Sequence, residues 1–336
     1  MFDIKKLQEE QSELNEDYYR KIVQSVSFLK RKLGNFKPFI AVAFGSGIGD
    51  LALDKNFKVY KSFDFEKIPN FPVPKVAGHK GKLIFATYKE VPLVLLQGRV
   101  HVYEVLDWQC GPIWATRIAT LPFRVIKGLE VREIITTHAC GGLAYNKSTD
   151  LQVGDLGIIF DHTNLLGISP LMGLNDERLG VRFPSKGMVA DPQMIKNFIS
   201  GVPNKRCHLA HYITSSSTPN YEGMGDLNAG LLKKECLKTS SKIVACFGMS
   251  MSFEADVIKH SSDLVAYLPI GLISNIISYP ETTTVEEFSK FNPNPTSHKE
   301  VLMAQKKIAE NFLPALLSYL AFLRKKKRRF INWKSR

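Results

Sequence analysis

Cysteine is scarce in this sequence, and its arrangement excludes two kinds of structural site. The five cysteines among 336 residues are odd in number and widely spaced, and none belongs to a C-x-x-C pair. A disulfide framework and a structural zinc site are therefore not expected, and the eight histidines add no cluster with metal-ligand spacing. We predict a protein without a bound metal in a reducing compartment, the cytoplasm or the nucleus.

Long apolar runs are also absent. The longest, Leu313 to Leu323, contains Pro314 and is too short to cross a bilayer. The chain passes from Met1 straight into a polar stretch, without the apolar segment of a secretory signal. We expect a soluble protein with no membrane partner. With 44% hydrophobic residues, it has enough apolar material for one large α/β domain or two ordinary ones.

A stripe of basic residues interleaved with aromatic residues, which would indicate a nucleic-acid surface, is missing although the formal net charge is +13. Six basic residues instead form one run at 324–329. Such a run is typical of a solvated tail, with a nuclear-localisation signal or an anionic-surface contact as alternatives. We predict a cytoplasmic protein, with the nucleus as the alternative, and no nucleic-acid partner except through this tail.

The sequence does contain apolar runs interleaved with helical segments, which is typical of an α/β fold. Residues 1–34 repeat apolar positions at three or four and predict an N-terminal helical segment packed on the domain. No internal repeat or linker interrupts residues 35–323, so we expect one domain there, followed by a basic tail over 324–336. Further helices are expected at 113–127 and 299–323, and strands at 39–44, 83–88, 92–97, 133–137, 155–160, 243–248 and 264–268.

The most informative segment is Gln-Gly-Arg-Val-His-Val-Tyr-Glu at residues 97–104. In an extended strand Arg99, His101 and Tyr103 would share one face, and the two intervening valines would face the core. A guanidinium beside an imidazole can hold an oxyanion such as phosphate. Taken alone, the segment favours a second interpretation, an edge strand with a solvent-exposed polar face and Arg99 paired to a surface carboxylate.

Two glycine-containing segments could supply backbone donors to an anion. Gly45-Ser46-Gly47-Ile48-Gly49 follows a predicted strand, and its N–H groups and the Ser46 hydroxyl could face a ligand. It lacks the Gly-Lys-Ser/Thr of a P-loop, and Asp50 occupies the third glycine position of a dinucleotide fingerprint. Ala139-Cys140-Gly141-Gly142 predicts a second tight turn after a strand. Each could equally be a purely structural turn.

Five segments together resemble the trimeric purine nucleoside phosphorylases, in the nucleoside phosphorylase and methylthioadenosine phosphorylase family. The resemblance extends from about residue 38 to residue 320. It implies a single-domain mixed β-sheet, partly barrel-like and surrounded by α-helices, in a homotrimer. The five segments, which occur in the order of that family, are 45–49, 68–72 with Gly78-His79, 97–104, 139–143 and 175–184.

The resemblance implies an activity and a set of site residues. Such enzymes cleave 6-oxopurine nucleosides, namely inosine, guanosine and their deoxy forms, with inorganic phosphate as co-substrate and no cofactor. The residues implied as catalytic are His101, Glu222 and Asn275. Those implied to bind phosphate are Ser46, Arg99, His101, Ala139 and Ser250. Those implied to bind ribose are Tyr103, Met249, His298 and, from a neighbouring subunit, Phe183. Those implied to bind the base are Tyr221, Glu222, Phe247, Ser274 and Asn275.

The chemistry of these residues suits the implied reaction. Cleavage of a glycosidic bond leaves positive charge on the sugar and negative charge on the base, and the phosphate anion can both attack and stabilise the cation. A carboxylate at Glu222 can accept from N1–H and a 2-amino group, while Asn275 can bond N7 and the 6-carbonyl. The bond to N7 strengthens as that atom gains charge. Glu104 is expected to orient His101.

The sequence departs from the family pattern at several positions. His138 stands where the family has Asn, and Gly223 and Ser274 each replace Thr, which could alter phosphate affinity and loosen base contacts. The segments before Met249 and His298 are longer than usual. Two alternatives therefore stay open, a methylthioadenosine phosphorylase and a catalytically silent paralogue that acts as a scaffold. The preferred nucleoside, the role of the tail and the choice between trimer and hexamer also stay open.

Overall fold

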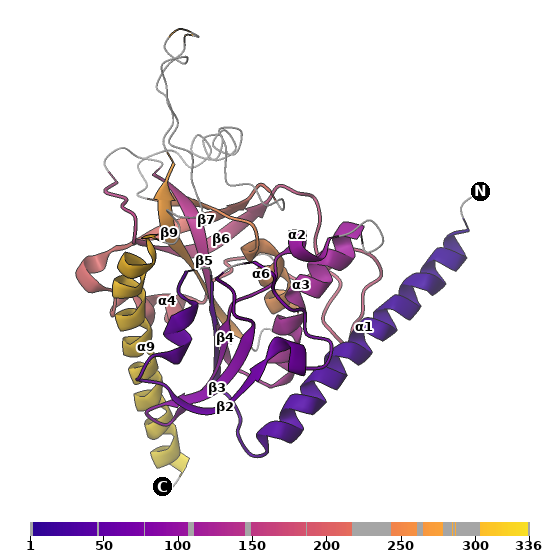
Figure 1. The fold of residues 1–336 in the computed structure, drawn as a ribbon, viewed down its shortest axis with the longest axis horizontal. Coiled ribbons are helices and arrows are strands. Elements are labelled where there is room, and N and C mark those ends of the chain that lie inside the picture. Colours follow the sequence, from indigo (N-terminus) through magenta and orange to yellow (C-terminus); the bar gives the residue numbers. More distant parts are fainter. Residues whose placement is uncertain are drawn as a thin grey trace.

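Nine strands form one continuous sheet in the computed structural model, and helices cover it on both sides (Figure 1). The strands are β1 (Ile40–Phe44), β2 (Lys58–Asp64), β3 (Lys82–Tyr88), β4 (Val91–Gln97), β5 (Glu133–Ala144), β6 (Leu156–Asn164), β7 (Cys207–Thr214), β8 (Val244–Phe247) and β9 (Ala266–Ile276). The helices are α1 (Ile4–Leu33), α2 (Val102–Val105), α3 (Gly111–Gly128), α4 (Pro192–Ile199), α6 (Met251–His260) and α9 (Gln305–Lys334). The structure describes residues 3–45, 47–76, 78–106, 111–144, 149–185, 187–216, 243–260, 265–277, 284, 286 and 303–334.

One part of the sheet closes on itself. The strand order is β2-β3-β4-β1-β5-β8-β7-β6-β9, and β9 pairs back to β5, so the last five strands form a closed barrel. The other four extend from the barrel as an open sheet, in which β1 is parallel to both β4 and β5. Both parallel and antiparallel pairs occur. The prediction of a mixed, partly barrel-like sheet surrounded by helices is confirmed.

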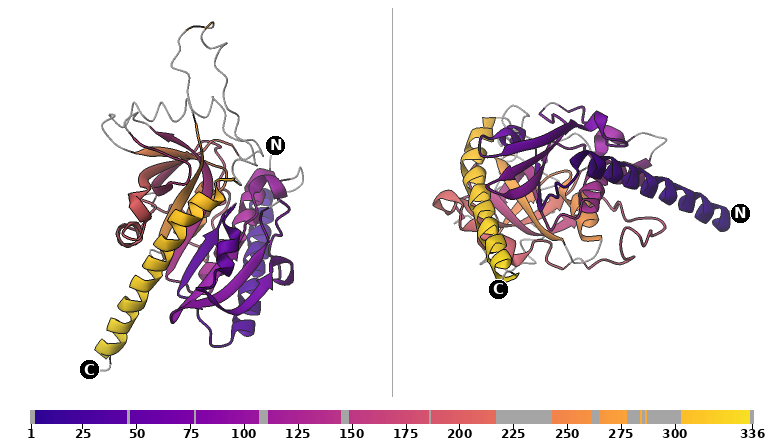
Figure 2. Two further views of the ribbon diagram at one scale, coloured as in Figure 1. Left: turned by 60° about the vertical axis from the view of Figure 1, so that its left-hand side comes forward. Right: turned by 90° about the horizontal axis from the view of Figure 1, so that it is seen from below.

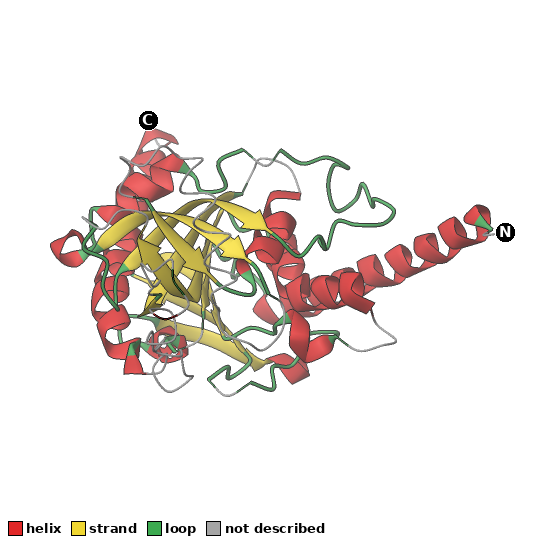
Figure 3. Cartoon of the chain, turned by 90° about the horizontal axis from the view of Figure 1, so that it is seen from above, coloured by secondary structure: helices red, strands yellow, loops and turns green. Residues whose placement is uncertain are grey.

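The alternation of side chains along the strands builds two apolar cores, one on each face of the sheet. In β1, Ala41 and Ala43 belong to the core that also contains side chains of α1, α3 and α6. Ile40, Val42 and Phe44 point the other way, into the core shared with α4 and α9. Figure 3 shows the strands between these groups of helices. Because both faces are buried, the strands read as continuous apolar runs.

The two long terminal helices lie on different sides of the molecule (Figure 2). Helix α1 begins at the cap residue Asp3, whose carboxylate accepts from the Lys6 N–H at 3.1 Å, and its N-terminal part projects from the body (Figure 1). Helix α9 continues to Lys334, beyond the C-terminal helix predicted for 299–323. Within the described part of the chain, no helix is long and apolar enough to cross a membrane.

Two local predictions are wrong. Residues 97–104 are not one strand, because β4 ends at Gln97, Gly98 adopts a φ of +97° and helix α2 starts at Val102. Both intervening valines are nevertheless buried, as expected. Residues 139–142 are not a turn either, because they lie inside β5 and pair with β8 and β9. There the strand completes the barrel, and its register with β9 shifts between Cys140 and Gly141.

Candidate active site

The middle of the barrel strand β5 brings distant parts of the chain together. Gly141 pairs with Phe247 on β8 and with Asn275 on β9, so two residues implied in base binding flank it. Asn275 lies just past the register shift, and its side-chain oxygen accepts from the Ser274 hydroxyl at 3.0 Å. Phe247 is buried in a small apolar cluster. Ala139 lies two residues before Gly141 on the same strand, next to this row.

Arg99 lies at the edge of this region because of the turn at Gly98. A Cβ on Gly98 would lie 2.9 Å from the Cα of His79, so only glycine fits this close approach. The Arg99 N–H then donates to His79 Nδ1 at 3.1 Å, and Arg99 Nη1 donates to the Thr137 carbonyl at 2.7 Å. The guanidinium therefore points toward β5. Arg99 is only 5% exposed.

His101 caps the short helix α2, and Glu104 holds it there. Glu104 Oε1 accepts from the His101 backbone N–H at 2.7 Å and lies 3.1 Å from His101 Nδ1. Burial raises the pKa of the Glu104 carboxyl, but hydrogen bonds from the His101 ring and from the Lys75 and His101 backbone outweigh it and lower the pKa to about 2. Because a carboxylate can only accept, His101 Nδ1 carries the ring proton, and Nε2 is the acceptor atom of the neutral ring. The predicted orienting contact of Glu104 is present in the structure.

The His101 ring also connects Tyr103 to Arg99. It stacks on the Tyr103 ring at a centroid distance of 5.1 Å and meets His79 edge-on at 5.2 Å. Burial, together with the nearby positive charge of Arg99, lowers the pKa of His101. Arg99, His101 and Tyr103 are thus adjacent, as predicted, although a turn and a helix bring them together instead of an extended strand.

Ser250 and Met249 occupy the turn between β8 and α6, half-buried beside β5. The Ser250 hydroxyl lies 3.2 Å from His138 Nδ1, and His138 Nε2 lies 2.8 Å from the Thr136 hydroxyl. Burial and the nearby positive charge of Arg99 hold the pKa of His138 well below its usual value, so this ring is neutral. The histidine that departs from the family pattern therefore contacts Ser250 directly.

Sequence reasoning missed one buried acid in this region. Glu254 lies four residues after Ser250 on α6, and its Oε1 is 2.9 Å from Arg99 Nε. Its Oε2 is 3.7 Å from His138 Nε2. Burial raises the pKa of Glu254 to about 7, against the opposing effect of Arg99. Ser250 immediately precedes α6 and its carbonyl accepts from the Glu254 N–H at 3.4 Å, but nothing in the sequence alone connects Glu254 with Arg99.

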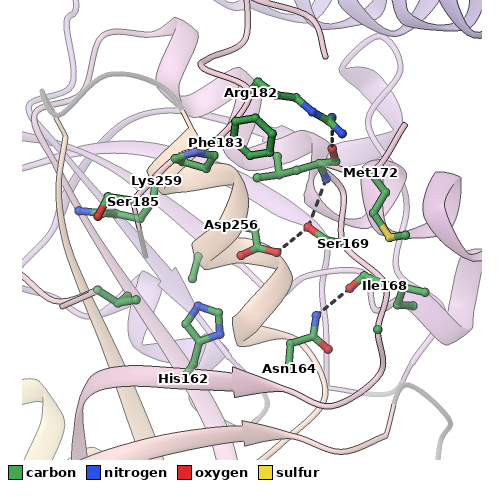
Figure 4. Close-up of a pocket in the computed structure, with 15 residues that line it drawn as sticks. His162, Asn164, Ile168, Ser169, Met172, Arg182, Phe183, Ser185, Asp256 and Lys259 are labelled. Carbon is green, nitrogen blue, oxygen red and sulfur yellow. Dashed lines mark hydrogen bonds between the residues drawn. The ribbon is translucent and has the colours of Figure 1, made fainter. Parts of the chain in front are cut away.

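Phe183 is separate from this cluster. It is 86% exposed, the largest exposed fraction of any large hydrophobic side chain among the described residues. It lines a pocket of about 370 Å³ with Arg182, Asp256 and Lys259 (Figure 4). Of the predicted site residues that the structure describes, no other lines that pocket. Within one chain, Phe183 therefore does not join the cluster around Arg99.

Four of the predicted residues lie outside the described part of the chain: Ser46, Tyr221, Glu222 and His298. The residue before Ser46 is described, and its N–H donates to the Thr137 hydroxyl at 2.8 Å. A Cβ on this residue, Gly45, would lie 2.4 Å from the Thr137 carbonyl oxygen, so glycine is required for the close approach to β5. Among the described residues no group of three His, Cys, Asp or Glu side chains could hold a metal ion.

Comparison with known proteins decides the family. Residues 39–302 match the phosphorylase superfamily. The chain belongs to this superfamily. Within it, the chain is 31% identical to purine nucleoside phosphorylase 1 of Bacillus subtilis (strain 168) over 303 residues, covering 90% of this chain and 98% of that protein. It is 40% identical to the bovine (Bos taurus) purine nucleoside phosphorylase over 161 residues, covering 47% of this chain and 51% of that protein.

Solved phosphorylase structures share the fold. Isoform 2 of the Schistosoma mansoni purine nucleoside phosphorylase, in complex with cytosine and ribose-1-phosphate, superposes with a TM-score of 0.69 at 26% identity, covering 90% of this chain and 96% of that one. The Schistosoma mansoni enzyme in complex with inosine gives a TM-score of 0.68 at 25% identity, over 90% and 95% of the two chains. The resemblance inferred from the five sequence segments is confirmed.

Proposed function

We propose that this chain cleaves purine nucleosides with inorganic phosphate, giving the free base and ribose or deoxyribose 1-phosphate. The observation that carries the proposal is the series of contacts from Arg99 through Glu254 and His138 to Ser250 beside β5, on which Gly141, three residues after His138, pairs with Asn275. The named purine nucleoside phosphorylases that resemble the chain over most of its length support it. Phosphate is the co-substrate, and no cofactor is invoked.

In this proposal Arg99, His101, Ser250 and the backbone at Ala139 hold phosphate, together with Ser46. The Ser250 hydroxyl can donate to the anion while its oxygen accepts from His138 Nδ1–H. Nδ1 can carry the ring proton because the Thr136 hydroxyl can donate to His138 Nε2. The phosphate oxygen attacks the anomeric carbon as the bond to the base breaks, and the bonding electrons pass to the base. The charge of the phosphate stabilises the developing sugar cation.

On the base side we assign Asn275 to N7 and the 6-carbonyl, and Glu222 to N1–H. This pattern favours 6-oxopurines, because adenine lacks the N1–H that a carboxylate needs. Ser274 supports the orientation of the Asn275 amide, because its hydroxyl contacts Oδ1 at 3.0 Å as well as the Cys140 carbonyl at 3.2 Å. Tyr221 and Phe247 complete the proposed base contacts, and Tyr103, Met249 and His298 the ribose contacts.

We further propose a homotrimer in which Phe183 covers the ribose of a neighbouring subunit. Its exposure, and its distance in the fold from the other site residues, support this role. The Phe183→Ala variant should lower kcat/KM for nucleosides by about tenfold, while its free energy of unfolding changes by less than about 0.5 kcal/mol. Thermal melting and sedimentation of the variant check both parts. Equal activity of variant and wild type would remove Phe183 from the site.

A panel assay tests the specificity. Inosine, guanosine, deoxyinosine, adenosine and methylthioadenosine are each incubated with and without phosphate, and release of the base is measured. Preference for inosine or guanosine is expected, with no turnover in the absence of phosphate. Preference for methylthioadenosine would support the related activity instead. The cytoplasm is the proposed compartment, in keeping with Cys207 and Cys246, which form no disulfide within the described part of the chain.

A further inference from the structure

The contact between Arg99 and Glu254 creates a problem of charge at the proposed phosphate site. Glu254 is 3% exposed and Arg99 5% exposed, and their nearest charged atoms are 2.9 Å apart. A charged Glu254 makes the pair neutral, so a dianion arriving at Arg99 meets no net positive charge. The anion and the carboxylate would instead repel each other at short range in a poorly solvated place.

The geometry of the pair suits an exchange of partners. The Arg99 Nε–H is not aimed at the carboxylate, so the contact is an ion pair without a directed hydrogen bond. Within the described residues, Arg99 Nη2 and Glu254 Oε2 have no hydrogen-bond partner. Buried donors and acceptors without partners cost free energy. An anion on Nη2 and a proton on the carboxyl group would relieve both costs.

We propose that Glu254 is a positioning residue that takes up a proton when an oxyanion binds Arg99, which frees the guanidinium for the anion. The proposal rests on the proposed function, because it takes Arg99 as a phosphate ligand. The anion that binds in this step is the phosphate co-substrate, which binds most tightly when Glu254 is neutral. Glu254 Oε2 lies 3.7 Å from His138 Nε2, beyond hydrogen-bond distance, so the neutral carboxyl leaves the contact between Thr136 and His138 as it is.

The surroundings of Glu254 favour this assignment. Burial raises its pKa to about 7 before any anion is present, so one further negative charge nearby moves it higher. His138, the other candidate proton acceptor, is 1% exposed, with a pKa held well below its usual value. Tyr267 and Tyr212 have raised pKa values and stay neutral. Arg124 and Lys127 on α3 bond the far end of α6. The other titratable and charged groups on elements packed around α6 are Arg99 and His101 after β4, His138 on β5, His162 on β6, Tyr212 on β7 and Tyr267 on β9.

Calorimetry with two anions tests the proposal. Sulfate keeps both charges across neutral pH, whereas phosphate itself gains a proton there, so sulfate reports the proton taken up by the protein. The full-length protein is titrated with each anion from about pH 6 to pH 9 in two buffers of different ionisation enthalpy. We expect uptake of about one proton per anion above pH 7, with anion affinity falling about tenfold per pH unit there. The KM for phosphate should rise in parallel, with a smaller change in kcat.

Variants assign the proton to a residue. Glu254→Gln should bind sulfate with little pH dependence and, with either anion, take up at least half a proton less than wild type. Glu133→Gln is the matched control, a buried acid bonded by the Tyr319 hydroxyl at 2.7 Å, and should behave as wild type. Equal proton uptake by wild type and Glu254→Gln, with binding still dependent on Arg99, would overturn this inference alone. Uptake lost only in His138→Asn would overturn it too. Anion binding unchanged in Arg99→Ala would instead contradict the proposed function.

Discussion

Two buried arginines, Arg117 on α3 and Arg99 after β4, have opposite surroundings. Each nitrogen of the Arg117 guanidinium donates to a neutral oxygen: Nε to Pro170 at 3.1 Å, Nη2 to Met172 at 2.8 Å and Nη1 to Asn15 at 2.8 Å. The same group lies over the Trp114 ring at 4.7 Å. One nitrogen of Arg99 donates to a carbonyl, a second lies 2.9 Å from a carboxylate without a directed hydrogen bond, and a third has no hydrogen-bond partner among the described residues.

The difference separates a structural arginine from one that can bind an anion. Arg117 ties α1 and the loop after β6 to α3, because each of its three nitrogens donates to a protein oxygen. Arg99 Nη2 has no hydrogen-bond partner among the described residues. The charge of Arg99 is balanced by Glu254, whose pKa is raised to about 7. A buried cation that has an unused donor and lies beside a carboxylate able to take up a proton is a better candidate for anion binding than an arginine whose three nitrogens all donate to neutral oxygens.

Replacing Arg99 should give the largest effect. Arg99→Ala removes the main positive charge at the proposed phosphate site, so kcat/KM for inosine phosphorolysis should fall by about 10²–10³, the cost of losing one donor to a developing charge. Steady-state kinetics at varied phosphate checks this, and circular dichroism verifies the fold. An Arg99→Ala enzyme with wild-type kinetics would show that the two arginines do not differ in function.

Replacing Arg117 should reverse that pattern. Arg117→Ala leaves the Pro170 and Met172 carbonyls without their donor and removes the packing on Trp114, so the free energy of unfolding should fall by about 2–4 kcal/mol. Urea denaturation measures this loss. The KM for phosphate of the remaining folded enzyme should stay within about twofold of wild type. A selective rise in that KM would contradict the role of Arg117 as a purely structural anchor.

The stability of the phosphate-free protein should depend on the charge of Glu254. The folded-state pKa of about 7 lies above the usual value of 4.5 for a glutamate, so the folded state binds more protons between these values. The stability contributed by the neutral carboxyl is therefore present below pH 4.5 and is lost as pH rises to about 7. Relative to Glu254→Gln, wild type should lose on the order of 1–3 kcal/mol across this window. Parallel curves of unfolding free energy against pH would contradict the buried, shifted acid.

The smallest of these effects is expected at Glu104, which supports the Arg99 region indirectly. Glu104→Gln keeps the size of the side chain but removes the negative charge that fixes the proton of His101 on Nδ1. We expect kcat/KM to fall by about tenfold, with a change in the acid limb of its pH profile. Because the pKa of Glu104 is lowered to about 2, the wild-type pair persists throughout that profile. An unchanged profile in the variant would show that Glu104 does not orient His101.

Residue types predicted the site better than local conformation did. Arg99, His101 and Tyr103 were expected side by side on a strand, since valines alternate with them and favour extended backbone. Tertiary contacts override that preference: the close approach of His79 to Gly98 turns the chain, and Glu104 completes the cap of α2. In contrast, seven of the nine described strands were predicted, because a buried strand needs only a continuous apolar run, whereas β2 and β7 were not predicted.

Glu254 could not be found from composition or motif. It lies in an apolar helix, and a lone acid there gives no indication of its partner, which comes from a segment 155 residues earlier in the chain. The turn predicted at 139–142 failed for a similar reason. Glycines favour turns locally, but here they belong to a strand that must pair on both sides to close the barrel.

The most direct test of the central claim is inosine turnover by wild type and Arg99→Ala, with and without phosphate, measured as hypoxanthine release. The account predicts turnover by wild type only when phosphate is present, with ribose 1-phosphate as the second product, and about a hundredfold or greater loss in the variant. Wild-type turnover without phosphate, or equal turnover by the two proteins with phosphate, would contradict it.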